Sequence, residues 1–549
     1  MPPSLQALLL HAVLLQTASC SPALTFLGGE SLGVPLTRPP DWYPVPVPGT
    51  PDGAGEAVLN SFVSYSIELA FFPDFAGNKA KPNIFSDNLL KNVGELQGTK
   101  PNVRVGGNTQ DYAIFDSNLR TATNATFIDS VSRDYPGILS IGPTFFESYQ
   151  TWPNVKFIHG FNLAKDDTAA TNSIIRSIPY ACRAIGKNNL LSWEMGNEPD
   201  LYKTSAQGAV RPSTWSEDDY VKEWASKVQT VKDALQKGCG ADWVSPTRFK
   251  WIAPSFAGPS NSLDALKAWQ AGLGASNGIS QFSAHNYIGG ATEPGVTLSN
   301  TLLNHEKTVS SISAHIKSLT TLKAAGMPLD YILSETNSLS NQGAPNLSNS
   351  FGAALWTLDY SLYAASSNIK QIYMHQGTDY RYASWQPIST SKTAIGTKAP
   401  YYGNIAVAAA LGNITSSPTR VQNLPLDSAT EAAYAVFAGA KLKSLVVINM
   451  DEYNHSVPNP SPRPEVSYNF TVPATCAGSG VVQRLLANGS DAITGITFNG
   501  QSYNYELDLG RPRSMANVTK DETVWVGADG GVTVPVWWSS AAVVHFTCL

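Results

Sequence analysis

Short apolar runs recur between residues 61 and 411, and stretches with a helical period separate most of them. Residues 218–236, 303–325 and 351–365 space their apolar side chains three and four positions apart, as amphipathic helices do. Runs that are apolar throughout indicate strands buried on both faces, as in a parallel sheet covered by helices. The runs are residues 62–72, 102–107, 155–163, 190–198, 249–256, 279–287, 331–336 and 369–376.

Eight such runs alternating with helices predict a (β/α)8 TIM barrel over residues 61–411, in the α/β class. An open, doubly wound sheet is the alternative. It would place a glycine-rich fingerprint early in the chain, and the sequence has none there. The pattern therefore favours the closed barrel.

A second pattern begins at residue 412, where the helical period disappears. Short apolar segments are joined by turns rich in Gly, Pro, Asn and Asp, which predicts a C-terminal antiparallel β-sandwich domain over residues 412–549. Its strands are expected at residues 433–437, 444–449, 467–472, 480–486, 503–509, 523–526, 531–538 and 541–546. Residues 21–60 are rich in Pro and Gly and are expected to be extended, with residues 23–35 available as one more strand of the sandwich.

Composition narrows the choice of partners. The 549 residues carry 37 Lys and Arg against 42 Asp and Glu, a net charge of −5, and only 14% of the chain is charged. No run of basic residues occurs, so a nucleic acid is not an expected partner. Few charges and 10% aromatic residues suit a protein that handles neutral or weakly acidic material.

The N-terminus predicts the compartment. Residues 5–15 are nearly all apolar, and Ala18 and Cys20 supply small residues at the −3 and −1 positions of a cleavage site. This run is too short to span a bilayer, and no later window approaches eighteen apolar residues. Residues 1–20 are therefore expected to be a signal peptide, and the protein is expected to be secreted, extracellular and without a membrane anchor.

Four cysteines remain after residue 20, an even number that suits an oxidising compartment. Three pairings are possible, and proximity in the chain favours Cys182 with Cys239 and Cys476 with Cys548. No CxxC, HExxH or HxH spacing occurs, so we expect neither a metal nor another cofactor. Seven glycosylation sequons are present, five of them after residue 410, at Asn124, Asn346, Asn413, Asn454, Asn469, Asn488 and Asn517.

Two glutamates stand where a barrel carries its catalytic groups, at the carboxyl ends of strands. Glu198 is the last residue of the fourth run, in the string Asn197-Glu198-Pro199, and Glu335 is the last but one of the seventh run. Facing each other across the mouth, they would supply the protonated acid and the charged carboxylate that a glycosidase needs. In a retaining enzyme these carboxyl groups lie about 5–5.5 Å apart.

The neighbours of Glu198 leave one alternative open. In an ideal strand Glu194 shares a face with Glu198, but Gly196 and Pro199 permit a kink that turns Asn197 and Glu198 together into the mouth. Asn197 would then donate to a sugar 2-hydroxyl. His285 and His375 end the sixth and eighth runs and are candidates to support the nucleophile. Of the tryptophans that could stack on sugar, Trp193 and Trp251 lie within strands and are expected in the core.

Longer motifs resemble a known family. Asn197-Glu198-Pro199 and Ser334-Glu335-Thr336 are similar to the clan A retaining glycosidases. The strings Val103-Arg104-Val105-Gly106-Gly107-Asn108, Trp193 through Pro199, His285-Asn286-Tyr287 and Gly343-Ala344-Pro345 resemble glycoside hydrolase family 79, which includes β-glucuronidases and heparanases. The resemblance covers nearly the whole mature chain, including the C-terminal β-domain.

The resemblance implies Glu198 as acid/base and Glu335 as nucleophile, with Glu68, Asn108, Asn197, Tyr287 and Tyr380 around the sugar. It implies an exo-acting β-glucuronidase whose partner is a carbohydrate with a β-linked uronic acid, with or without a 4-O-methyl group. A heparanase-like endo-β-glucuronidase would want clustered Lys and Arg, and only Arg381 and scattered lysines are found. An arabinofuranosidase, a xylosidase and a non-enzymatic carbohydrate-binding wall protein are further alternatives.

Overall fold

Eight parallel strands close into the predicted barrel, and each lies on one of the predicted apolar runs. The computed structural model describes residues 35–36, 44–204, 208–275, 278–476 and 478–548, so the predicted signal peptide lies outside the described residues. In the order in which they pair, the strands are β3 (Val63–Glu68), β4 (Val103–Gly106), β8 (Phe157–Phe161), β9 (Leu190–Met195), β10 (Trp251–Phe256), β11 (Ile279–Gly290), β12 (Asp330–Ser340) and β13 (Ile372–Gln376).

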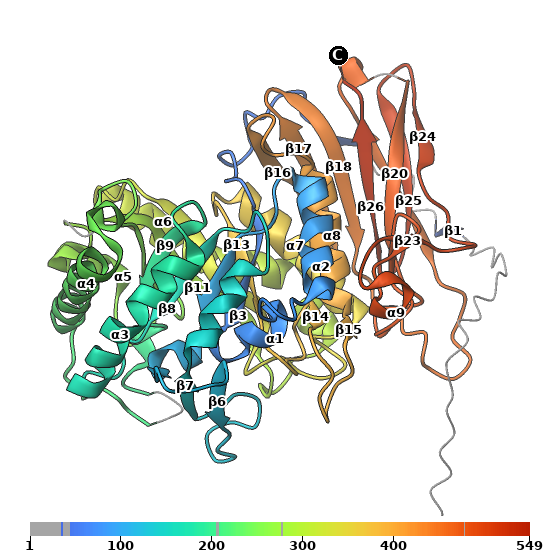
Figure 1. The fold of residues 1–549 in the computed structure, drawn as a ribbon. Helices are drawn as coiled ribbons and strands as arrows, with labels where there is room; N and C mark the ends of the chain where they lie inside the picture. Colours follow the sequence, from blue (N-terminus) through green and yellow to red (C-terminus); the bar gives the residue numbers. More distant parts are fainter. Residues whose placement is uncertain (1–34, 37–43, 205–207, 276–277, 477, 549) are drawn as a thin grey trace, which may run out of the picture. The chain divides into compact units, whose positions relative to one another are not determined.

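Helices cover the outside of the barrel (Figure 1). They are α2 (Ile84–Gln97), α3 (Thr168–Ile185), α4 (Glu217–Cys239), α6 (His305–Ala324), α7 (Phe351–Ser366) and α8 (Ala399–Leu411). The three helices expected from the sequence correspond to α4, α6 and α7. Helix α4 begins at a reciprocal cap, in which Ser216 and Asp219 each satisfy the other's backbone N–H. One link departs from the pattern: between β4 and β8 lie a small sheet, β5 (Ile114–Phe115), β6 (Thr123–Thr126) and β7 (Ile138–Ile141), and a 3-10 helix (Pro143–Gln150).

The C-terminal domain is a sandwich of two sheets that encloses its own apolar core. The larger sheet packs its other face against α7 and α8, so its central strands are buried on both sides (Figure 1). Its strands are β16 (Thr419–Leu424), β17 (Glu431–Ala438), β18 (Lys441–Asn449), β26 (Ser540–Phe546), β20 (Gly478–Leu486), β21 (Thr497–Phe498), β22 (Gln501–Ser502), β23 (Arg513–Ser514) and β24 (Glu522–Val526).

The smaller sheet joins the two ends of the chain. Its centre is the antiparallel pair β19 (Glu465–Thr471) and β25 (Gly531–Trp537). The N-terminal segment adds β1 (Pro35–Leu36) and β2 (Val45–Pro46), both parallel to β19. The N-terminal segment thus contributes β1 and β2 to the smaller sheet, and residues 23–34 of the predicted strand lie outside the described residues.

One predicted strand, at residues 503–509, is wrong. The chain instead forms a short helix, α9 (Tyr505–Asp508), which ends at Leu509 and Gly510 with φ of 49° and 80°. The apolar alternation that suggested a strand has a different cause, because Tyr503 and Tyr505 pack on barrel helices through Tyr401 and Phe85, whereas Leu507 and Leu509 are exposed.

Both expected disulfides are present, and the asparagines of all seven sequons are at least partly exposed. Cys182 pairs with Cys239 and joins α3 to α4, and Cys476 pairs with Cys548 after the last strand, which confirms the predicted pairing. Asn124, Asn346, Asn413, Asn488 and Asn517 are exposed, and Asn454 and Asn469 are half-buried. Within the described residues, no helix has the length and apolar character needed to cross a membrane.

Candidate active site

A cavity of about 870 Å³ opens at the carboxyl ends of the barrel strands, and most of the predicted site residues line it. Both glutamates, Glu198 and Glu335, line it. Of the other predicted site residues, the ones in its wall are Glu68, Asn108, Asn197 and Tyr287. Tyr380 does not line the cavity. Its ring is fully buried and its hydroxyl reaches Glu68 Oε2 at 3.3 Å, while the wall position is taken by Tyr382.

Glu335 reaches the cavity because β12 contains an irregularity. Leu333 pairs with Ile372 and Thr336 pairs with Met374, so β12 has one residue more than β13 at this point. Such bulges turn a side chain away from its regular direction and are common beside active sites. The Glu335 carboxylate accepts from the Tyr287 hydroxyl at 2.7 Å and from Arg104 Nη1 at 2.6 Å.

The surroundings of Glu335 favour its charged form. Burial alone would raise the pKa of this carboxyl group, but the positive charges of His375 and Arg104 and the hydrogen bond from Tyr287 outweigh burial and hold the pKa well below its usual range. His375 Nδ1 lies 3.5 Å from Glu335 Oε2. Glu335 is therefore an ionised carboxylate at neutral pH, as a nucleophile must be.

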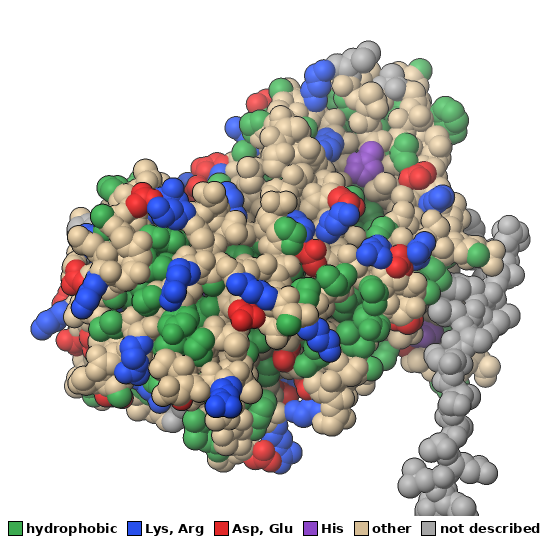
Figure 2. Space-filling model, in the orientation of Figure 1, with side chains coloured by type: hydrophobic (Ala, Val, Ile, Leu, Met, Phe, Trp, Pro, Cys, Tyr) green, Lys and Arg blue, Asp and Glu red, His purple; other side chains and the backbone are tan. Residues whose placement is uncertain are grey.

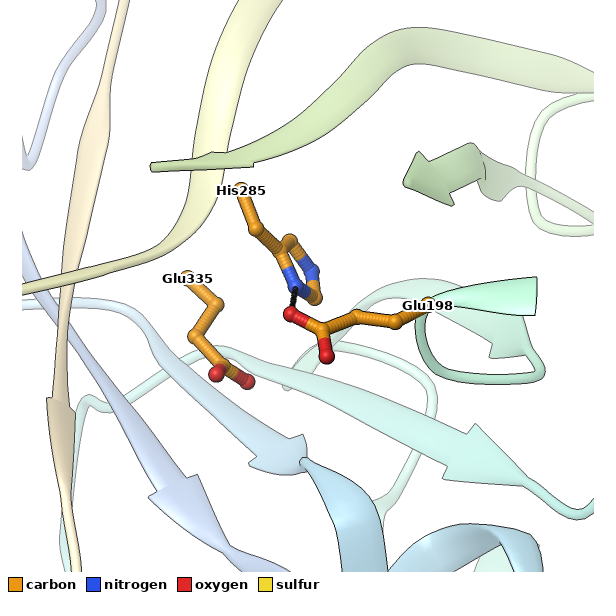
Figure 3. Close-up of side chains that lie close together, drawn as sticks. All are labelled: Glu198, His285 and Glu335. Atoms are coloured by element: carbon orange, nitrogen blue, oxygen red, sulfur yellow. Dashed lines mark hydrogen bonds and ion pairs between the residues drawn. The ribbon is translucent and has the colours of Figure 1, made fainter. Parts of the chain in front are cut away.

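Glu198 is positioned by a turn rather than by a strand. Strand β9 ends at Met195, and the backbone then adopts a φ of 80° at Gly196 and 49° at Glu198. A left-handed conformation costs a non-glycine residue about 1–2 kcal/mol, so the surrounding structure must hold the turn. The result is that Asn197 and Glu198 both line the cavity, with the Glu198 side chain directed towards Glu335 (Figure 3).

The surroundings of Glu198 favour its protonated form. Burial and the nearby negative charge of Glu335 raise the pKa of Glu198 above its usual range. His285 Nδ1 lies 2.9 Å from Glu198 Oε1 (Figure 3), and burial lowers the pKa of His285 to about 4, so the imidazole is neutral at pH 7. A carboxylate oxygen of Glu198 lies within 4.8 Å of one of Glu335.

Arg104, on β4, ties the site together. Its Nε donates to Glu194 at 2.8 Å, and its Nη1 donates to Glu335 and to the Ser66 hydroxyl. Its Nη2 donates to Asn197 Oδ1 at 2.8 Å, so the amide of Asn197 keeps its Nδ2 for other partners. Arg104 belongs to the motif Val103 through Asn108, but no role was predicted for it from the sequence. The available signal was a charged residue inside a strand that is otherwise apolar, because such a charge is rarely buried without a partner.

Glu194, which the sequence left open as an alternative acid, instead binds the Arg104 guanidinium. It is fully buried, accepts from Arg104 on one oxygen and from the Ser255 hydroxyl at 2.6 Å on the other, and does not line the cavity. Of the two histidines expected beside the nucleophile, His375 does lie next to Glu335, whereas His285 contacts Glu198. The side chains of Trp193, Trp251 and Trp385 are all buried in the core, so none of them offers a stacking face.

One set of three side chains among the described residues could present ligand atoms to a metal ion, namely Glu198, His285 and Glu335. Two carboxylates and an imidazole are suitable ligands for a divalent cation. However, the Arg104 guanidinium already occupies the Glu335 carboxylate at 2.6 Å, and this fixed positive charge opposes a second cation. The donor set is therefore a poor fit to a metal.

A barrel with one protonated and one ionised glutamate facing each other at its mouth defines a glycoside hydrolase. Residues 433–543 match the glycosyl hydrolase family 79 C-terminal beta domain. A beta-glucuronidase from Aspergillus niger is 53% identical over 504 residues, which are 90% of this chain and 92% of that protein. A beta-glucuronidase from Neurospora crassa is 49% identical over 529 residues, covering 89% and 94%. The chain belongs to glycoside hydrolase family 79.

Solved structures agree on the fold. A 4-O-α-L-rhamnosyl-β-D-glucuronidase from Fusarium oxysporum superposes with a TM-score of 0.71 at 22% identity, covering 91% of this chain and 99% of that one. A family 51 arabinofuranosidase from Xanthomonas axonopodis superposes with a TM-score of 0.59 at 14% identity, covering 92% and 100%. At these identities the likeness concerns the barrel and β-domain architecture alone.

Proposed function

We propose that the protein is a secreted, retaining, exo-acting β-glucuronidase that releases terminal β-linked glucuronic acid from polysaccharides or glycoconjugates. The observation that carries the proposal is the pair Glu198 and Glu335, whose environments favour opposite protonation states across less than 4.8 Å. Two relatives named beta-glucuronidase, each about half identical over some nine-tenths of the chain, support the choice of sugar.

The geometry supports a double displacement. Glu335 attacks the anomeric carbon while Glu198 gives its proton to the leaving oxygen, and the sugar becomes an ester of Glu335. Glu198, now ionised, takes a proton from water as that water attacks the same carbon and restores the Glu335 carboxylate. Asn197, with its carbonyl oxygen held by Arg104, presents its Nδ2 to the sugar 2-hydroxyl.

The charge around the cavity supports a short substrate over a long polyanion. Among the described residues that line the cavity, Lys165 is the only lysine or arginine. Figure 2 displays Lys and Arg singly over the visible face, among acidic and neutral side chains, without a continuous basic surface. A heparan-like chain needs such a surface, whereas a single terminal uronate does not. The disulfides and the partly or fully exposed sequons support an extracellular site of action.

Hydrolysis of a panel of p-nitrophenyl glycosides tests the sugar, and proton NMR of the first product tests the mechanism. We expect activity on the β-D-glucuronide, with the β-anomer of glucuronic acid appearing before the α-anomer. Activity confined to an arabinofuranoside or xyloside would reject the sugar, and an initial α-anomer would reject retention. Paired substrates with and without a 4-O-methyl group, and with the glucuronic acid terminal or internal, test the remaining details.

A further inference from the structure

Asp111 is the last residue of the 3-10 helix Asn108–Asp111, which follows β4. Its carboxylate accepts hydrogen bonds from four donors on two other segments of the chain. Its Oδ2 accepts from the Asn197 backbone N–H at 2.9 Å and from the Tyr202 hydroxyl at 2.7 Å. Its Oδ1 accepts from the backbone N–H groups of Leu163 at 3.0 Å and Ala164 at 3.4 Å. The side chain is 6% exposed, and every one of these partners is a donor.

The segment that Asp111 holds is the turn that carries Glu198. The Asn197 N–H is bound by Asp111, and the Glu198 N–H is bound by the Ser255 carbonyl at 3.0 Å. These two consecutive N–H groups, which lie between the left-handed Gly196 and the left-handed Glu198, are thus fixed from outside the turn. Because that conformation is unfavourable in itself, the position of the Glu198 carboxyl group depends on these two anchors.

The groups that donate to Asp111 are themselves held by other residues, so Asp111 is part of a rigid network. Arg211 donates to the Ala164 carbonyl at 2.8 Å and to the Leu163 carbonyl at 3.2 Å, so the peptide group between Leu163 and Ala164 is held from both of its sides. Its guanidinium lies 5.7 Å from the centre of the Tyr202 ring, which stacks on Trp215 with ring centres 5.8 Å apart.

We propose that Asp111 is a positioning residue for the acid/base: it holds the Asn197–Glu198 turn so that the Glu198 proton meets the leaving-group oxygen. The proposal rests on the proposed function, in which Glu198 is the proton donor. A misplacement of about 1 Å can cost on the order of 100-fold in rate. The loss should fall on the step that needs the proton and spare the rest of the site.

Asp111→Asn is the decisive variant. The amide keeps the shape of the side chain but replaces one acceptor oxygen by an NH2 group that faces donors, so two of the four hydrogen bonds are lost. At pH 7, where Asp111 is ionised in the wild type because burial raises its pKa only to about 6, we compare an alkyl β-glucuronide with p-nitrophenyl β-glucuronide. We expect kcat/KM to fall about 100-fold for the alkyl substrate, whose leaving group needs protonation, and less than about fivefold for the nitrophenyl substrate.

Two further variants make the test specific. Tyr202→Phe removes one donor and leaves the Asn197 contact, so the same split between substrates should appear at smaller size. If Asp111→Asn does not fold, Tyr202→Phe alone tests whether Asp111 positions the Glu198 turn. Asp74→Asn is the matched control: Asp74 is a half-buried aspartate that accepts from the Thr378 hydroxyl at 2.7 Å, and its replacement should change neither substrate's kcat/KM.

Rescue by azide distinguishes a variant in which the Glu198 carboxyl group is displaced from one in which it is absent. Glu198→Ala should be rescued by azide on p-nitrophenyl β-glucuronide, yielding the β-azide, whereas Asp111→Asn should not, because its carboxyl group at position 198 is still present. Equal losses on both substrates, or no loss, would overturn the role of Asp111. If the wild type hydrolyses neither glucuronide, the proposed function fails instead, and the same comparison is made with the glycoside that it does hydrolyse.

Discussion

Two histidine–carboxylate pairs have almost the same geometry and opposite charge states. In the active site, His285 Nδ1 lies 2.9 Å from Glu198. Where the barrel helices meet the large sheet of the β-domain, His305 Nδ1 lies 2.8 Å from Asp359, which also accepts from the Tyr434 hydroxyl at 2.6 Å. The pKa of His285 is lowered to about 4, mainly by burial, whereas the pKa of His305 is raised, because the charge of Asp359 and its hydrogen bond outweigh burial.

The difference lies in what surrounds each pair. Glu198 lies largely out of water beside the negative charge of Glu335, so it holds its proton and gives the fully buried His285 no charge to pair with. His305 is 13% exposed and faces Asp359 directly, so the imidazolium is favoured. Contact distance alone therefore does not decide whether such a pair is ionic, and the active-site pair is built to be neutral until the reaction moves a proton.

The largest effect is expected when the negative charge of Glu335, which makes the His285–Glu198 pair differ from the His305–Asp359 pair, is removed. Glu335→Gln removes the proposed nucleophile and should reduce kcat by roughly 10⁴-fold or more. It also removes the negative charge that raises the pKa of Glu198, so that pKa should fall. Infrared titration of the carboxyl band of this variant measures it, with Glu198→Gln/Glu335→Gln to identify the band. An unchanged pKa would mean that burial alone keeps Glu198 protonated.

A smaller effect is expected at His285. His285→Phe leaves the Glu198 carboxyl group without its imidazole partner. We expect kcat/KM on an alkyl glucuronide to fall about 10- to 100-fold, because proton transfer by a positioned side chain contributes roughly 10²–10⁴-fold in rate and this variant loses part of it. Because the folded-state pKa of His285 is lowered, the wild type loses stability as pH falls from about 6.5, the pKa of a free histidine, towards 4. The stability difference between wild type and variant, from urea unfolding, should therefore shrink on acidification.

The smallest effect is expected at His305, and its pH dependence should have the opposite sign. The folded-state pKa is raised, so the pair stabilises the protein fully below about pH 6.5, and this contribution is lost as pH rises through the folded-state pKa. His305→Gln should lower the free energy of unfolding by about 1–3 kcal/mol at pH 5.5, with kcat/KM unchanged. The control, His455→Gln, breaks a more exposed pair with Asp491 and should cost less than about 0.5 kcal/mol. A difference that grows with rising pH would contradict the ionic pair.

The barrel and the two glutamates could be predicted because their signals are local. The barrel strands are short and mostly apolar, and Glu198 and Glu335 each lie at or next to the end of such a run. The strand predicted at residues 503–509 failed because its alternating apolar residues contact different neighbours. Period two specifies a strand only when every second residue faces the same layer.

The residues that connect the site could not be found in this way. Asp111 binds groups 52, 53, 86 and 91 positions away, and nothing in its own neighbourhood reveals that they converge. Tyr380 and Tyr382 show the same difficulty over a short range. The turn before them passes through Asp379 with a φ of 66°, and Tyr382, not Tyr380, reaches the cavity wall.

Strand β2 also sets the order in which the protein can be completed. It pairs with β19, about 425 residues later in the chain, so Val45 and Pro46 have no partner until β19 has been made. At about 5–20 residues per second, a ribosome needs roughly 20 to 85 s to cover that distance. The small sheet therefore cannot form until late in synthesis, and the early segment must stay available as an unpaired strand while the whole barrel is produced.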